Sequence, residues 1–252
     1  MPIEHYKRIL AVLLLVASSG TILFCGIRWW RHHQAEEYII AVLRTPDRIA
    51  RMRAEARMRE TNRLESARIT ADLLDSPDQA VRIEAIRAIP ILHAQADVSD
   101  TLARQLRTSR DRDVRLGCAI NLMSIKTPTV RSAYTYALRD SSEKVVEIAC
   151  MEVGLGGGDG TKEALLSVLN NPSWRVRLEA CKAMIVSKTA DETTIAALDQ
   201  LSRESEAAIY DAEIDDFDRI KRQTGTQGAL GPRWGKLASI KDRARQVAAG
   251  HR

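Results

Sequence analysis

Short polar turns alternate with apolar stretches along the chain at a nearly constant spacing. Each of five turns begins with Thr, Ser or Asn, and five residues later a small aliphatic side chain opens an apolar helix face. The turns begin at Thr45, Ser76, Ser109, Ser141 and Asn171, so the successive spacings are 31, 33, 32 and 30 residues. A period in this range is typical of repeat arrays in which each repeat packs only on its neighbours.

The residue types in the turns predict where the helices begin. The first residue of each turn is expected to be an N-cap, with proline at the first helical position in three copies and an acid in the first turn of most. A small side chain follows the aliphatic one after four residues, which allows the preceding amphipathic segment to pack closely against it. These small residues are Ala54, Ala85, Cys118, Cys150 and Ala180. The predicted repeat is therefore a pair of antiparallel helices, and the predicted fold is an all-α solenoid.

Two copies carry a resemblance to a known family. Residues 73–85 read LLDSPDQAVRIEA, and residues 168–180 read VLNNPSWRVRLEA. Both resemble the short HEAT repeat in the style of bilin lyases. The resemblance covers about residues 34–220 and is strongest from 62 to 187. It implies a solenoid of helix pairs, but HEAT-like solenoids serve as scaffolds, as a few lyases and in one DNA-repair class, so the fold alone does not give the function.

An apolar stretch precedes the repeats. Residues 9–27 contain no charged side chain and, at about 1.5 Å per residue, span roughly the thickness of a bilayer core. We expect a transmembrane helix over residues 9–30, with Arg28, Trp29, Trp30 and Arg31 at the membrane interface. The alternative is a signal peptide cleaved near residue 19. The continuation of the apolar run to Ile27 argues against this alternative. The predicted segments are a tail (1–8), the membrane helix (9–30), a basic degenerate capping repeat (31–61), the solenoid (62–220) and a basic tail with a linker (221–252).

Charge is unevenly distributed between these segments. Residues 28–70 carry ten arginines and six acids, residues 71–220 carry 18 basic and 25 acidic side chains, and residues 221–252 carry eight basic side chains and one acid. The acidic repeats argue against nucleic acid as a partner. The basic ends are either solvated or contact anionic lipid headgroups. The expected location is a single-pass protein of the bacterial inner membrane, and the excess of arginine after the span favours the cytoplasmic side for the solenoid.

Four residues are candidate partner contacts, three that depart from the repeat pattern and one in the tail. Trp174 is aromatic where other copies are polar, and is either a plug between turns or a binding hot spot. Glu147 replaces an arginine that follows the aliphatic residue in three other copies, where the arginines are expected to form a ladder with Asp78, Asp111, Asp113 or their neighbours. Asp211 stands on the face of a polar end cap that no further repeat is expected to cover. Trp234 begins a basic amphipathic stretch that is expected either to fold back on the acidic cap or to dock to a partner.

No catalytic, cofactor-binding or metal site is predicted. The glycine-rich segment 156–160 lacks the ending of a phosphate loop and is interpreted as a break between helices. The cysteines of the repeats occupy packing positions and are interpreted as small buried side chains. The first hypothesis is a membrane-anchored scaffold that binds a protein partner, associated with the membrane, as an accessory or assembly subunit of a complex. The alternative is an enzyme similar to bilin lyases that acts on a chromophore-binding protein.

Overall fold

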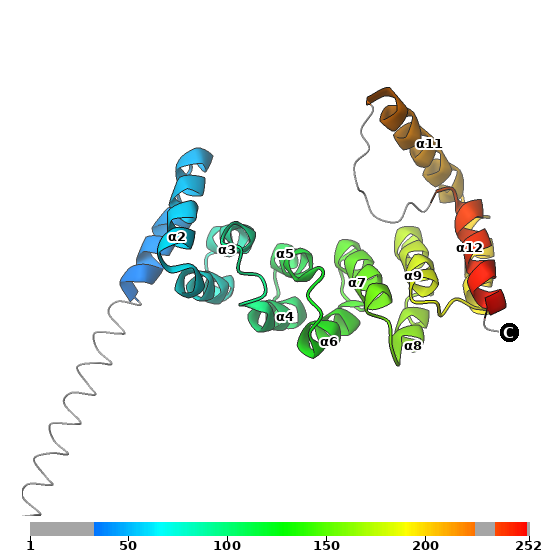
Figure 1. The fold of residues 1–252 in the computed structure, drawn as a ribbon, viewed down its shortest axis with the longest axis horizontal. Coiled ribbons are helices and arrows are strands. Elements are labelled where there is room, and N and C mark those ends of the chain that lie inside the picture. The colour runs from blue at the N-terminus through cyan, green and yellow to red at the C-terminus, as the bar shows by residue number, and fades with distance from the viewer. Residues whose placement is uncertain (1–32, 225–234, 251–252) are drawn as a thin grey trace, which may run out of the picture. The chain divides into compact units, whose positions relative to one another are not determined.

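The computed structural model describes residues 33–224 and 235–250, including all side chains in these ranges except those of residues 61–62 and 216–224. Every regular element in these ranges is helical (Figure 1). The all-α prediction is therefore confirmed for this part of the chain. The chain divides into two compact units, one ending at Val98 and the other beginning at Ser99.

The first unit contains a helix over residues 33–43, followed by α2 (Arg48–Asp72), a short 3₁₀ helix η1 (Leu73–Asp75) and α3 (Gln79–Ile91). α2 and η1 both pack against α3. Ile69, Leu73 and Leu74 are buried, as the amphipathic pattern of this segment predicts. α2 continues without a break across residue 61, where the sequence pattern placed the boundary between the capping repeat and the solenoid.

The second unit contains nine described helices that form stacked pairs. In order these are α4 (Ser99–Thr108), α5 (Arg112–Leu122), α6 (Pro128–Ala137), α7 (Glu143–Gly156), α8 (Thr161–Leu166), α9 (Trp174–Val186), α10 (Glu192–Leu201), α11 (Glu206–Thr224) and α12 (Leu237–Gly250). α4, α6 and α8 lie in one layer, and α5, α7 and α9 lie in the other (Figure 1). α4 contacts α6, α5 contacts α7, and α7 contacts α9. This arrangement is the predicted stack of antiparallel pairs.

In the layer that contains α5, α7 and α9, the helices begin later than the turn chemistry predicted. The difference is two residues at α5 and α9 and one residue at α7. Asp111, not Ser109, is the N-cap of α5, and its carboxylate accepts a hydrogen bond from the Asp113 amide at 3.0 Å. The Ser109 hydroxyl accepts one from the Asp111 amide at 3.3 Å and so closes the turn before the helix. The prolines therefore precede the helices. The predicted Thr–Pro geometry occurs instead at α6, where Thr127 is the N-cap and Pro128 follows it.

Small side chains allow the close packing of α5, α7 and α9 within their layer, as expected. Cys118, Cys150 and Ala180 are fully buried. A further small residue, Gly154 on α7, lies directly against Ala183 on α9. The helix break at the glycine-rich segment is confirmed, because α7 ends at Gly156 and the backbone of Gly157 has φ of 56°.

No helix among residues 33–224 and 235–250 is both long and apolar enough to cross a bilayer. The predicted membrane helix at residues 9–30 lies outside the described residues, and so do its interface residues Arg28, Trp29, Trp30 and Arg31.

Candidate interaction site

Arginines bind the turns of the repeats. The side chain of each arginine that follows the aliphatic residue reaches back six residues and donates to a backbone carbonyl at 2.7–3.3 Å. The four bonds join Arg51 to Thr45, Arg82 to Ser76, Arg115 to Ser109 and Arg177 to Asn171. Each bond satisfies a carbonyl that the turn leaves outside the helix, so the arginine stabilises its own repeat.

At least three of these arginines also link their repeat to the next one. Arg51 pairs with Glu84 on α3 at 3.3 Å. Arg115 donates to both carboxylate oxygens of Asp140, from Nε at 2.7 Å and from Nη2 at 2.9 Å. Arg177 also donates to both carboxylate oxygens of Glu204, in this case from Nη2 alone, at 2.7 and 2.5 Å. A ladder between repeats is present, and the acids that pair with Arg115 and Arg177 in it come from the turn that follows each of their helix pairs. The hydrogen bonds with Asp140 raise the pKa of Arg115 further above its ordinary value.

Glu147 interrupts this ladder. Its side chain is 17% exposed and pairs with Lys144 of the same helix at 2.7 Å through Oε2. Its Oε1 atom is buried and has no hydrogen-bond partner. The structure thus leaves little of Glu147 for a partner protein to contact, and its role as a partner-binding residue stays a prediction.

Trp174 is a plug between turns. Its side chain is almost fully buried at 7% exposure, and its ring Nε1 donates to the Leu201 carbonyl at 3.3 Å. The ring packs against Tyr210 with 5.5 Å between centroids, and the Lys182 ammonium lies 5.4 Å from the Tyr210 ring. The hot-spot interpretation of Trp174 is therefore wrong for this structure, because the indole is covered by α10 and α11 of its own chain.

Asp211 is engaged by the C-terminal helix. Its Oδ1 accepts a hydrogen bond from the amide of Leu237, the first residue of α12, at 2.9 Å. The Tyr210 hydroxyl donates to the Gly235 carbonyl at 3.2 Å, and Lys236 pairs with Asp215 at 2.8 Å. The tail thus folds back on the acidic cap, which confirms one of its two expected behaviours. The cap is covered by the tail and not by a further repeat, since α12 packs against α9, α10 and α11. Trp234 lies outside the described residues.

The cysteines of the second unit are buried, as expected, and none forms a disulfide. Burial raises the pKa of all three thiols, and that of Cys181 reaches about 12. A thiol held protonated in this way is a poor nucleophile. In the part of the chain that the structure describes, no group of His, Cys, Asp and Glu side chains has the geometry of a metal site.

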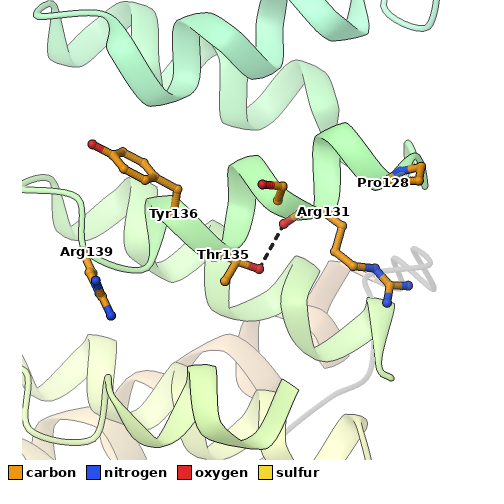
Figure 2. Close-up of a pocket in the computed structure, with 6 residues that line it drawn as sticks. Pro128, Arg131, Thr135, Tyr136 and Arg139 are labelled. Carbon is orange, nitrogen blue, oxygen red and sulfur yellow. Dashed lines mark hydrogen bonds between the residues drawn. The ribbon is translucent and has the colours of Figure 1, made fainter. Parts of the chain in front are cut away.

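A groove runs along the outer face of α6, which the sequence patterns did not single out. It has a volume of about 610 Å³ and is lined by Pro128, Arg131, Ser132, Thr135, Tyr136 and Arg139. Figure 2 shows Tyr136 and Arg139 toward one end of this face, and Pro128 and Arg131 toward the other. These residues recur at intervals of three or four, so they share one side of a helix.

Packing on the opposite side holds α6 rigidly. Val130, Ala133, Tyr134 and Ala137 are buried, and the Tyr134 hydroxyl donates to the Ala119 carbonyl at 2.7 Å. Arg131 donates to the carbonyls of Gly156 and Gly157, both at 3.2 Å, at the C-terminal end of α7. Tyr136, in contrast, is 61% exposed. In the sequence, the spacing of the lining residues was the signal that could have indicated the groove. A solvated helix face shows the same spacing, however.

Part of the chain matches a known family of repeats. Residues 132–214, less than half of the chain, match the family model of HEAT repeats. Similar solved structures include an engineered protein, 16% identical over 86% of this chain and 97% of that chain (TM-score 0.46). A designed armadillo repeat protein is 12% identical over 85% of this chain and 99% of its own (TM-score 0.43). No curated protein matches the chain. The family match thus identifies HEAT repeats in the segment from α6 to α11.

Proposed function

We propose that this protein is a membrane-anchored scaffold whose HEAT repeats bind a protein partner, as an accessory or assembly subunit of a membrane complex. The observation that carries the proposal is the groove on α6. A large aromatic side chain, Tyr136, is mostly exposed there on a helix that is fixed by its neighbours. Tyrosine and arginine are the side chains most often found at the energetic centres of protein interfaces, and a rigid platform lowers the entropic cost of binding.

The membrane part of the proposal rests on the sequence. The uncharged run within residues 9–30 has the length of a membrane span, and Arg28, Trp29, Trp30 and Arg31 have the composition of a membrane interface. An anchor of this kind would concentrate the repeats at the bilayer, where a membrane-associated partner and anionic lipid are both within reach. The inner membrane, with the repeats on the cytoplasmic side, is the proposed location.

Site-specific crosslinking in intact cells tests the proposal. A photoreactive amino acid replaces Tyr136 in the full chain, and Arg203, which is exposed on the turn after α10, is replaced in a matched control. We expect the Tyr136 position to give a discrete crosslinked protein in detergent-solubilised membranes, and the Arg203 position to give none. Recovery of the chain from membranes without a crosslinked or copurifying protein would contradict a scaffold role. Recovery in the soluble fraction would contradict the anchor.

The lyase alternative is not carried forward. The resemblance to bilin lyases concerns the style of the repeat, and no specific feature among the described residues favours chromophore chemistry.

A further inference from the structure

The outer face of the layer that contains α4, α6 and α8 is locally basic, although the repeats as a whole are acidic. α6 and the residue pair after it, residues 128–139, contain two arginines and no acid. α4, which packs beside α6 in the same layer, contributes Arg104 and Arg107 against the single acid Asp100. All four arginines are exposed. We define the α4–α6 face as these four arginines together with Tyr136.

The two arginines that line the groove stand at opposite ends of it, Arg131 within α6 and Arg139 two residues after its end, and Tyr136 lies toward the Arg139 end (Figure 2). Arg131 and Arg139 are eight residues apart, which corresponds to about 12 Å along a helix. An extended peptide covers that distance with about four residues. Arg131 is held in place by its bonds to Gly156 and Gly157. Arg139 forms no ion pair with another described residue, so its charge is available to a ligand.

The acidic stretch of a second copy is a poor candidate for this site. Residues 204–218 carry seven acids, and the structure already engages all five of those whose side chains it describes. Glu204 binds Arg177, Glu206 accepts a hydrogen bond from Ser205, Glu213 binds Arg175, Asp211 binds the α12 amide and Asp215 binds Lys236. Docking this stretch onto another copy would break contacts that the monomer makes.

A flat bilayer surface fits the face less well than a peptide does. Contact with headgroups needs positive charge alone, whereas this face combines charge with a groove and a projecting aromatic ring. Carboxylates pair with guanidinium groups through two parallel hydrogen bonds, and an aliphatic side chain packs on a tyrosine ring.

We propose that the α4–α6 face binds an acidic peptide segment of a protein partner, whose carboxylates pair with Arg131 and Arg139 and whose apolar side chain packs on Tyr136. This inference rests on the proposed function and names the class of partner that the scaffold takes.

Selection from a random peptide library against the full chain in detergent tests the inference. We expect the enriched peptides to be rich in Asp and Glu, with an apolar residue between the acids. A synthetic copy of the most enriched peptide is then the probe for affinity measurements. Its binding should weaken about tenfold or more in Arg139→Glu and in Tyr136→Ala, and should weaken as salt is raised. Arg203→Glu makes the same charge change outside the face and should bind normally.

The other outcomes distinguish this inference from its alternatives. Enrichment of neutral or basic peptides, or equal affinity in Arg139→Glu, would overturn it. Flotation with phosphatidylglycerol vesicles that depends on Arg139, together with peptide binding that does not, would also overturn it. Self-association of the protein that disappears in Arg139→Glu would overturn it as well. The exposed positions of both substitutions predict an unchanged circular dichroism spectrum and unfolding midpoint. If the Tyr136 crosslink captures a protein but the acidic peptides fail, the scaffold stands and only the inference is lost.

Discussion

Gly154 on α7 and Ala183 on α9 lie so close that the glycine has no room for a side chain. A Cβ atom at Gly154 would come within 2.8 Å of the Cα, Cβ and O atoms of Ala183. Two of these atoms are backbone, so they cannot move aside as the end of a flexible side chain would. The close approach of the two helices in this layer therefore depends on the missing methyl group.

Gly154→Ala should destabilise the protein, even though alanine favours helix more than glycine does. Overpacking costs typically about 1–3 kcal/mol, against a gain in helix propensity of up to about 1 kcal/mol. The free energy of unfolding in urea measures the difference. Gly156→Ala on the same helix is the control, because its Cβ would meet only the Arg131 side chain at 3.9 Å. Equal stability of the two variants would show that α7 and α9 are not held at this distance.

Arg115 and Asp140 form the most buried ion pair of the ladder, with side-chain exposures of 12% and 7%. Removing one partner leaves the other charge buried, which costs about 3–5 kcal/mol. Arg115→Ala should therefore lower the free energy of unfolding by about that amount, since the carbonyl of Ser109 also loses its donor. A double-mutant cycle with Asp140→Ala measures the coupling. Additive effects of the two substitutions would mean that the pair contributes no coupling to stability.

Arg245→Ala is a suitable control for this cycle. Arg245 also forms an ion pair, with Asp242, but the two side chains are 55% and 66% exposed. Exposed pairs contribute about 0–1 kcal/mol, so this substitution should have a small effect.

The repeat architecture could be predicted because its signals are local. Turn residues and helix periodicity recur every 30 to 33 residues, and the short-range geometry of the chain converts them into helix pairs. The helix start was misplaced because Ser109 and Asp111 are both favoured N-caps. Only the backbone geometry shows that the serine closes the turn while the aspartate caps the helix.

The interaction site could not be predicted in the same way. Tyr136 and Arg139 differ from solvated residues only in their surroundings, which depend on how α6 packs. Trp174 shows the converse, since an aromatic residue at a normally polar position suggested a surface contact. The covering element is α11, whose Tyr210 meets the indole from 36 positions further along the chain. Signals that depend on such distant segments are not present in the local pattern.

Trp174→Ala should destabilise the second unit by about 3–5 kcal/mol, as expected for removal of a large buried aromatic side chain. Trp174→Phe keeps an aromatic ring beside Tyr210 and loses the hydrogen bond to the Leu201 carbonyl. Its cost should be about 1 kcal/mol, plus a smaller packing loss. Thermal unfolding followed by circular dichroism measures both. An unchanged melting temperature in Trp174→Ala would show that the indole is not a structural plug.

Glu55 gives the first unit a pH dependence. The side chain lies in a position that is only 2% exposed, and burial raises its pKa above the ordinary 4.5. The folded state therefore holds this proton more tightly than the unfolded state does. The stabilising contribution of the protonated Glu55 side chain to the free energy of unfolding is fully present below about pH 4.5, and it is lost as pH rises through the folded pKa. Glu55→Gln should therefore be more stable than the parent protein at pH 7, and the difference should shrink toward pH 4.

The exposed Glu60 on the same helix serves as the control, because Glu60→Gln makes the same substitution at a position that the fold leaves in solvent. Urea unfolding at a series of pH values compares the three proteins. A Glu55→Gln variant that is less stable than the parent at neutral pH would mean that the ionised carboxylate makes a net favourable contact, for example with Arg51, that outweighs its desolvation.

Asp211 caps α12 from a different helix, and the cap should control whether the tail stays docked. Asp211→Ala removes the acceptor for the Leu237 amide, which should cost about 1 kcal/mol. Ile240 remains buried at 0% exposure and Lys241 remains paired with Asp199, so we expect α12 to loosen and the other helices to hold. Hydrogen exchange should rise in α12 alone. Asp242→Ala, which removes an exposed acid paired with Arg245 of α12 itself, should change exchange little. Uniformly faster exchange from α4 to α11 in Asp211→Ala would instead mean that the docked tail supports the whole second unit.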